Sequence, residues 1–123
     1  MFEKDMHFSI LLDFYGEILT DRQREMLECY YNDDMSLSEI SDSVGISRQG
    51  VRSAIKKGTD ILTEMEIKLG LASRFQQVQG LLTDISRQLT ELRLAVSDAE
   101  AQKRIDAIML QLGQLDESDK EDN

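Results

Sequence analysis

Apolar residues recur every three or four positions along most of the chain, which predicts an all-α protein. The first apolar stripe predicts a helix, and this helix could end at Gly16 because glycine weakens a helix. Thr20 followed by Gln23 has the spacing of a capping box and predicts a second helix that ends near Asn32. The apolar stripe of the first segment consists of Phe8, Leu11, Leu12, Tyr15, Ile18 and Leu19.

The segment 36–57 predicts two capped helices that are joined by a very short turn. Ser36 and Glu39 form a second capping box, and Gly45 can adopt the left-handed conformation that ends the helix. Ser47 then caps the next helix. The inward positions at helical spacing are Leu37, Ile40, Ser41 and Val44 in the first helix and Val51, Ala54 and Ile55 in the second. This arrangement is typical of a helix-turn-helix.

A different pattern begins at Leu71, where apolar residues alternate at spacings of four and three, as in a heptad seam. The seam consists of Leu71, Phe75, Val78, Leu82, Ile85, Leu89, Leu92 and Val96. Ser97 and Glu100 have capping-box spacing, and a second seam follows at Ala101, Ile105, Ile108, Leu112 and Leu115. The two long amphipathic helices must bury these seams, either against each other as a hairpin or against a second chain.

These patterns divide the chain into three parts. Residues 1–69 form the helix-turn-helix domain, residues 70–115 form a helical hairpin or association region, and residues 116–123 form a disordered acidic tail. If the second part is an association region, the chain is a homodimer. Its contacts are expected at Leu71, Phe75, Val78, Leu82, Ile85, Leu89 and Leu92.

Composition narrows the possible functions. The chain of 123 residues has one Cys, one His and no Pro, so it offers no zinc site of usual spacing and no internal disulfide. It contains no glycine-rich phosphate loop and no nucleophile with a neighbouring base, which argues against an enzyme and a bound cofactor. No apolar run approaches the length of a membrane span, and the acidic amino end is unlike a secretory signal. We therefore expect a cytoplasmic protein.

The second helix of the motif carries an unusual charge distribution. The chain has a net charge of −10, yet the outward face of this helix holds four cations and no acid. Those outward residues are Arg48, Gln49, Arg52, Ser53, Lys56 and Lys57. Together with the hydroxyl of Ser47, they form a candidate nucleic-acid-binding face: Arg pairs well with guanine, Gln with adenine, and Lys with phosphate.

Two known families resemble this chain. The stretch from Thr20 to Glu66 is similar to the promoter-reading region 4 of sigma factors in its order of elements. More closely, LLDFYGEILTDRQREMLECYYNDDMSLSEISDSVGISRQ and the IKK and KL that follow resemble the YlxM family of small bacterial proteins. In that family Ala-Val-Tyr-Asp usually follows ISRQ, whereas this chain has Gly50-Val51-Arg52-Ser53. The YlxM resemblance implies a non-enzymatic regulator linked to the signal recognition particle pathway.

Two function classes follow from the residues and the resemblance together. In the first, the protein is a regulator that binds DNA or the RNA of the signal recognition particle. In the second, it is an adaptor that binds the GTPases of that particle or RNA polymerase, because a strongly acidic chain favours basic partners. Double-stranded RNA is the harder target, since its deep and narrow major groove does not admit a recognition helix.

Overall fold

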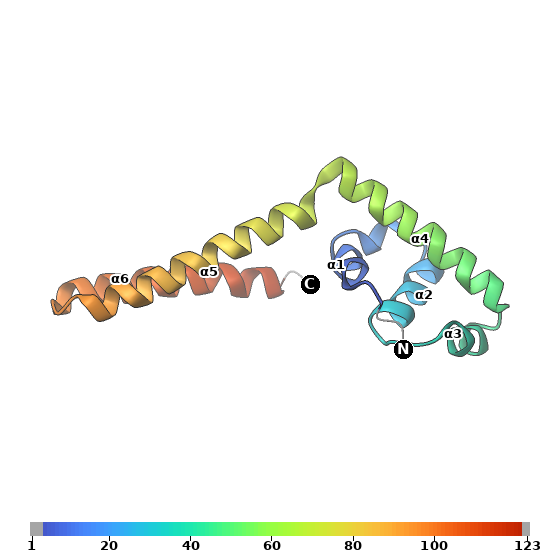
Figure 1. Ribbon diagram of the computed structural model, residues 1–123, viewed down its shortest axis with the longest axis horizontal. Helices are drawn as coiled ribbons and strands as arrows, with labels where there is room; N and C mark the ends of the chain where they lie inside the picture. The colour runs from blue at the N-terminus through green and yellow to red at the C-terminus, as the bar shows by residue number, and fades with distance from the viewer. Residues whose placement is uncertain (1–3, 122–123) are drawn as a thin grey trace. The chain divides into compact units, whose positions relative to one another are not determined.

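The computed structural model describes the backbone of residues 4–121 and the side chains of residues 4–115. The predicted all-α fold is confirmed for this part of the chain, which contains no strand. The elements are α1 (Met6–Tyr15), the 3-10 turn η1 (Gly16–Ile18), α2 (Asp21–Tyr31), α3 (Leu37–Val44), α4 (Arg48–Leu69), α5 (Leu71–Ala95) and α6 (Ala99–Glu121) (Figure 1). The predicted tail, 116–123, lies outside the residues whose side chains are described.

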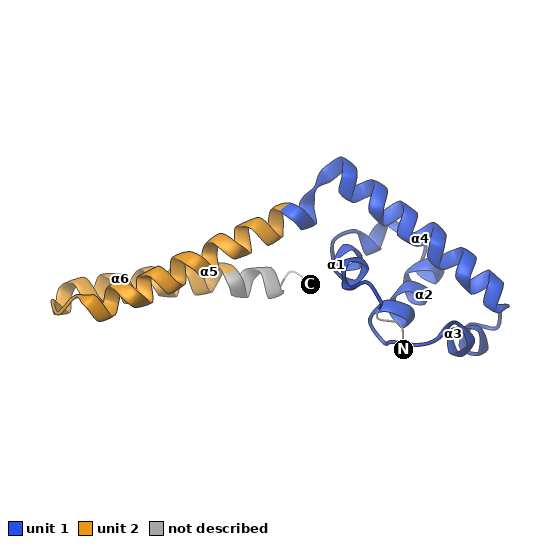
Figure 2. Ribbon diagram, viewed as in Figure 1, with its two compact units in different colours: residues 1–73 blue, residues 74–123 orange. Residues whose placement is uncertain are grey.

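The chain divides into two compact units, Met1–Ser73 and Arg74–Asn123 (Figure 2). The division falls slightly beyond the predicted boundary at residue 69, because the first turn of α5 is bonded to unit 1. The side chain of Glu66 accepts hydrogen bonds from the backbone N–H groups of Ala72 and Ser73, at 3.1 and 3.0 Å. These are donors that a helix start leaves without a partner.

Tyr15, at the end of α1, holds Glu66 in place. Its hydroxyl donates to Glu66 Oε1 at 2.6 Å and accepts from the N–H of Leu71 at 3.1 Å. The hydrogen bond from Tyr15 lowers the pKa of Glu66 below its usual value, so the carboxylate stays ionised. Burial, followed by the hydrogen bond to Glu66, raises the pKa of the Tyr15 hydroxyl. Residues from both ends of unit 1 thus supply the acceptors for the backbone donors at the start of α5.

The core of unit 1 lies between α4 and the three shorter helices, which all contact it (Figure 1). Its fully buried large side chains are Leu11, Leu27, Ile40, Val51 and Leu62. The capping boxes at Thr20 and Ser36 are both present and start α2 and α3 where the sequence predicts. The prediction is wrong for one residue of the apolar stripe in the first helix. Ile18 is half exposed, because η1 replaces the last turn of that helix.

Unit 2 is an antiparallel hairpin of α5 and α6. Arg93 of α5 binds Asp106 of α6 with an Nε to Oδ1 distance of 2.7 Å, and the side-chain amide of Gln102 donates to the carbonyl of Val96 at 2.9 Å. The predicted capping box at Ser97 is wrong. Asp98 caps α6 instead, accepting from the N–H of Ala101 at 3.0 Å. No helix in the described residues combines the length and apolar character that crossing a membrane requires.

Candidate nucleic-acid interface

The turn between α3 and α4 is built from three residues with separate tasks. Gly45 adopts the left-handed conformation, with φ of 81°, and its N–H donates to the carbonyl of Ser41. The hydroxyl of Ser41 donates to the carbonyl of Ile46, which fixes the far side of the turn. Ser47 accepts from the N–H of Gly50 at 3.0 Å and so starts α4 at Arg48. The predicted helix-turn-helix is confirmed, with its predicted helix starts.

Gly50 lies against this turn. A Cβ added at Gly50 would lie 3.2 Å from Ser47 Oγ and 3.4 Å from Ile46 Cδ1, which is tighter than ordinary contact. Glycine is a weak helix former, but at this position it leaves room for the capping hydroxyl of Ser47 and for the side chain of Ile46.

Replacing Ser47 with Ala is expected to destabilise unit 1 by about 0.5–2 kcal/mol. The substitution removes the acceptor for the Gly50 N–H at the start of the longest helix of that unit. Urea unfolding monitored by circular dichroism measures the change. Ser53→Ala is the matched control, because Ser53 is exposed nearly two turns further along and makes no cap. Equal unfolding midpoints for the two variants would contradict the capping role.

The outward face of α4 is arranged as the sequence predicts. All six predicted residues, Arg48, Gln49, Arg52, Ser53, Lys56 and Lys57, are exposed, whereas Val51 and Ile55 are buried. Lys56 differs from the other cations because its Nζ lies 3.3 Å from Oδ1 of Asp60, one turn further along. Among the described residues, no ion pair involves Arg48, Arg52 or Lys57. Three cations of this face are therefore available to an external anion.

The start of α4 and the start of α3 line one open hollow of about 530 Å³. Its walls come from Arg48, Gln49 and Arg52 on α4 and from Ser36, Leu37 and Ser38 on α3. None of the six is acidic, although the chain as a whole carries a net charge of −10. The residues predicted for this site from the sequence did not include Ser36, Leu37 or Ser38. The signal available for Ser38 was its exposed position in the first turn of α3, two residues after the Ser36 cap.

A further cation lies near the turn. Arg22 of α2 donates from Nη2 to the carbonyl of Val44 at 3.2 Å, where a positive charge is favourable because it faces the carbonyl end of α3. Arg22 was not among the predicted site residues. Within the described residues, no three His, Cys, Asp or Glu side chains lie together as a metal site would require.

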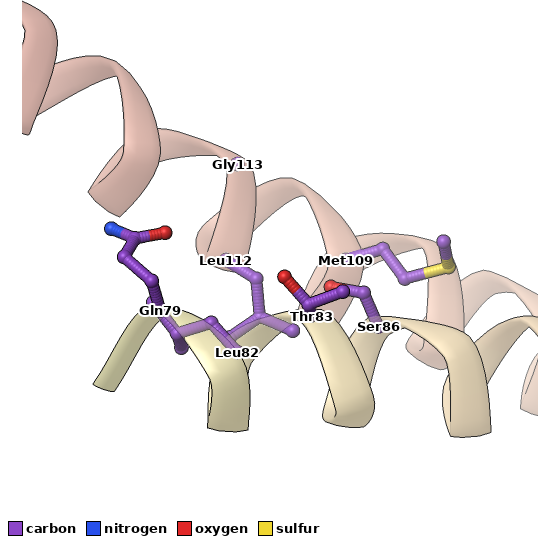
Figure 3. Close-up of a pocket in the computed structure, with 7 residues that line it drawn as sticks. All are labelled: Gln79, Leu82, Thr83, Ser86, Met109, Leu112 and Gly113. Carbon is purple, nitrogen blue, oxygen red and sulfur yellow. The ribbon is translucent and has the colours of Figure 1, made fainter. Parts of the chain in front are cut away.

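The predicted association residues fall into two groups in the structure. Val78, Ile85 and Leu92 are exposed, as are Leu71 and Phe75. Leu82 and Leu89 are half-buried, and Leu82 lies beside Met109 and Leu112 of α6 (Figure 3). The hairpin therefore covers only part of the predicted seam.

Comparison with known proteins gives consistent matches. A family model described as "Putative helix-turn-helix protein, YlxM / p13 like" matches residues 2–105. A UPF0122 protein of Acetivibrio thermocellus is 41% identical over 107 residues, which cover 85% of this chain and 92% of the relative. A UPF0122 protein of Thermoanaerobacter sp. is 40% identical over 89% of this chain and 94% of its own length. One from Listeria monocytogenes is 41% identical over 74% of this chain and 83% of its own length.

Proposed function

The chain belongs to the YlxM/p13-like helix-turn-helix family, and from that premise we propose that it is a regulatory protein that binds duplex DNA through α4. One observation carries the proposal: Arg48, Gln49 and Arg52 line an acid-free hollow together with the start of α3. On a chain with a net charge of −10, such a local concentration of free cations favours a polyanionic ligand.

The geometry supports a definite division of work among these residues. In a helix-turn-helix the second helix lies in the major groove with its first residues at the base edges. Arg48, Gln49 and Arg52 occupy the first two turns of α4, and their side chains suit guanine and adenine. Lys57, further along the exposed face, and the hydroxyls of Ser36 and Ser38 suit phosphate contacts, which position a protein without reading sequence.

The setting we propose is the signal recognition particle pathway, which the resemblance to the YlxM family implies. Regulation of that pathway at the DNA level needs only the duplex contacts described above. A direct contact with the RNA of the particle would have to use loops, bulges or phosphates, because A-form RNA does not admit α4 into its major groove.

Selection from a random duplex DNA pool tests the proposal. The wild-type protein is expected to enrich a defined sequence motif, and Arg48→Ala/Arg52→Ala is expected to lose that enrichment. Lys68→Ala is the control, because Lys68 lies in the last turn of α4, away from the hollow, and is paired with Glu64. If the wild type enriches no motif but crosslinks in cells to the GTPases of the signal recognition particle, the protein is an adaptor and not a DNA-binding regulator.

A further inference from the structure

The hairpin of unit 2 leaves a large share of its apolar positions uncovered. Among its described side chains, only Ile105 is buried. Six others have exposed fractions between 40% and 63%: Val78, Leu81, Ile85, Leu92, Ile108 and Leu115. Two helices of more than 20 residues each therefore share very little core, although most helix stability in proteins comes from burying an apolar face.

The uncovered residues follow a regular rule. Ile85 and Leu92 each come three residues after the half-buried Leu82 and Leu89, and on α6 Ile108 and Leu115 come three residues after Ile105 and Leu112. A step of three residues turns an α-helix by about 300°, so each exposed residue lies roughly 60° from its covered neighbour, in the same sense on both helices. Because α5 and α6 are antiparallel, the same rotation brings both rows to one side of the hairpin. We call this side the apolar flank.

The opposite side of the hairpin has a different character. There, a hollow of about 280 Å³ is lined by small and polar residues together with three large apolar ones: Gln79, Thr83, Ser86, Gly113, Leu82, Met109 and Leu112 (Figure 3). The large apolar residues of this hollow are half-buried in the hairpin, whereas those of the apolar flank are exposed. The asymmetry indicates that only the apolar flank is built to be covered.

Each helix of the hairpin has two apolar positions per heptad, the number that a helix uses against one partner. On α5, Leu82 and Leu89 hold one of these positions, and Ile85 and Leu92 hold the other. The hairpin half-buries the first pair and leaves the second pair exposed. One of the two positions on each helix therefore still lacks a covering neighbour.

We infer that the apolar flank binds the same flank of a second copy of this chain, forming a four-helix bundle from two hairpins. A twofold pair gives both helices their missing neighbour at once, because the surface is then complementary to itself. The positions between the apolar residues of the flank hold Gln88, Gln111 and Arg104, and none of them is acidic. The nearest acids on α5, Asp84 and Glu91, are both bound by Arg87. Two copies can therefore approach here without the repulsion that their net charge of −10 causes elsewhere.

The flank gathers six large apolar side chains that are each at least 40% exposed, whereas a monomer usually leaves apolar residues scattered singly over its surface. A stable pair buries at least about 1,200 Å² in total, so the polar positions beside these side chains have to contribute to the interface as well.

Sedimentation equilibrium of the full chain tests the inference. The wild type is expected at about 28 kDa, twice the chain mass of 14.1 kDa. Ile85→Lys/Leu92→Lys is expected to sediment as a monomer at concentrations where the wild type is a dimer. The matched control is Leu94→Lys/Leu110→Lys, because these leucines are 82% and 67% exposed but lie away from the apolar flank. The control is expected to remain a dimer.

Circular dichroism separates loss of association from loss of folding. Both replaced residues of the flank are exposed in the single chain, so the monomeric variant is expected to keep its helical signal. Ile85→Gln/Leu92→Gln provides a milder uncharged variant, which should raise the dimer dissociation constant at least tenfold. A wild type that stays monomeric up to high micromolar concentration, or flank variants that remain dimers, would overturn the inference.

Discussion

Gly58→Ala is expected to lower the free energy of unfolding of unit 1, even though alanine is the better helix former by about 1 kcal/mol. Gly58 is buried in α4 where that helix crosses α2. A Cβ at this position would lie 2.7 and 2.9 Å from the two Cδ atoms of Leu27. Leu27 is fully buried, so it cannot turn away without displacing other core residues. Overpacking of this kind costs about 1–3 kcal/mol, which outweighs the gain in helix propensity.

The sign of this effect is expected to reverse when Leu27 is removed. Leu27→Ala alone should cost about 2–5 kcal/mol, because it leaves a cavity in the core. In that background Gly58→Ala meets open space and partly fills the cavity, so it should stabilise the protein. Urea unfolding of the four proteins in a double-mutant cycle measures the coupling between the two positions.

Gly80→Ala is the control for helix propensity. Gly80 lies inside α5 and an added Cβ meets nothing within 4 Å, so this variant should gain up to about 1 kcal/mol in the helix that carries it. If Gly58→Ala stabilises unit 1 as Gly80→Ala stabilises α5, the close contact between α4 and α2 is not rigid.

The capped ends of the helices could be predicted from sequence because capping is local. Ser36, Gly45 and Ser47 each act on a backbone group within four residues, so their spacing alone carries the information. The cap of α6 shows where this approach fails. Ser97 and Asp98 are adjacent and are both favoured N-cap residues, and the choice between them depends on how the chain turns.

Contacts between distant residues could not be predicted in the same way. Tyr15 reaches Glu66 across 51 positions of sequence, and no local pattern marks Glu66 as the cap of α5. The approach of Gly58 to Leu27 is equally invisible, because glycine inside a helical pattern only reduces the expected stability of that helix. Both features depend on how the helices pack.

The candidate site was predictable to a greater extent, since it lies on one face of a single helix. Helical periodicity alone places Arg48 and Arg52 on the same side of α4, and the structure bears out their exposure. Helical periodicity could not show that α3 contributes Ser38 to the same hollow. The ion pair of Lys56 was not predicted either, because its partner Asp60 lies one turn further along, beyond the acid-free stretch that ends at Lys57.

Salt titration of DNA binding should distinguish the cations of α4 from one another. Each phosphate that is neutralised contributes about −0.9 to the slope of log affinity against log salt concentration. Lys57→Ala is therefore expected to flatten the slope by about one and to weaken all sequences alike. Lys56→Ala should have a smaller effect, because Lys56 must first leave Asp60. For the same reason Asp60→Asn should strengthen binding to every sequence.

Arg48→Ala and Arg52→Ala are expected to behave differently, each costing about 1–3 kcal/mol on a preferred site and relaxing the preference for particular bases. On random duplex their effect should be much smaller, since base contacts contribute little there. Lys68→Ala is the matched control: it removes an exposed cation from the last turn of α4, where Lys68 is paired with Glu64. Competition titrations with preferred and random duplexes measure these differences. If either arginine variant weakens both duplexes equally, that arginine contacts phosphate, and sequence is read elsewhere on the protein.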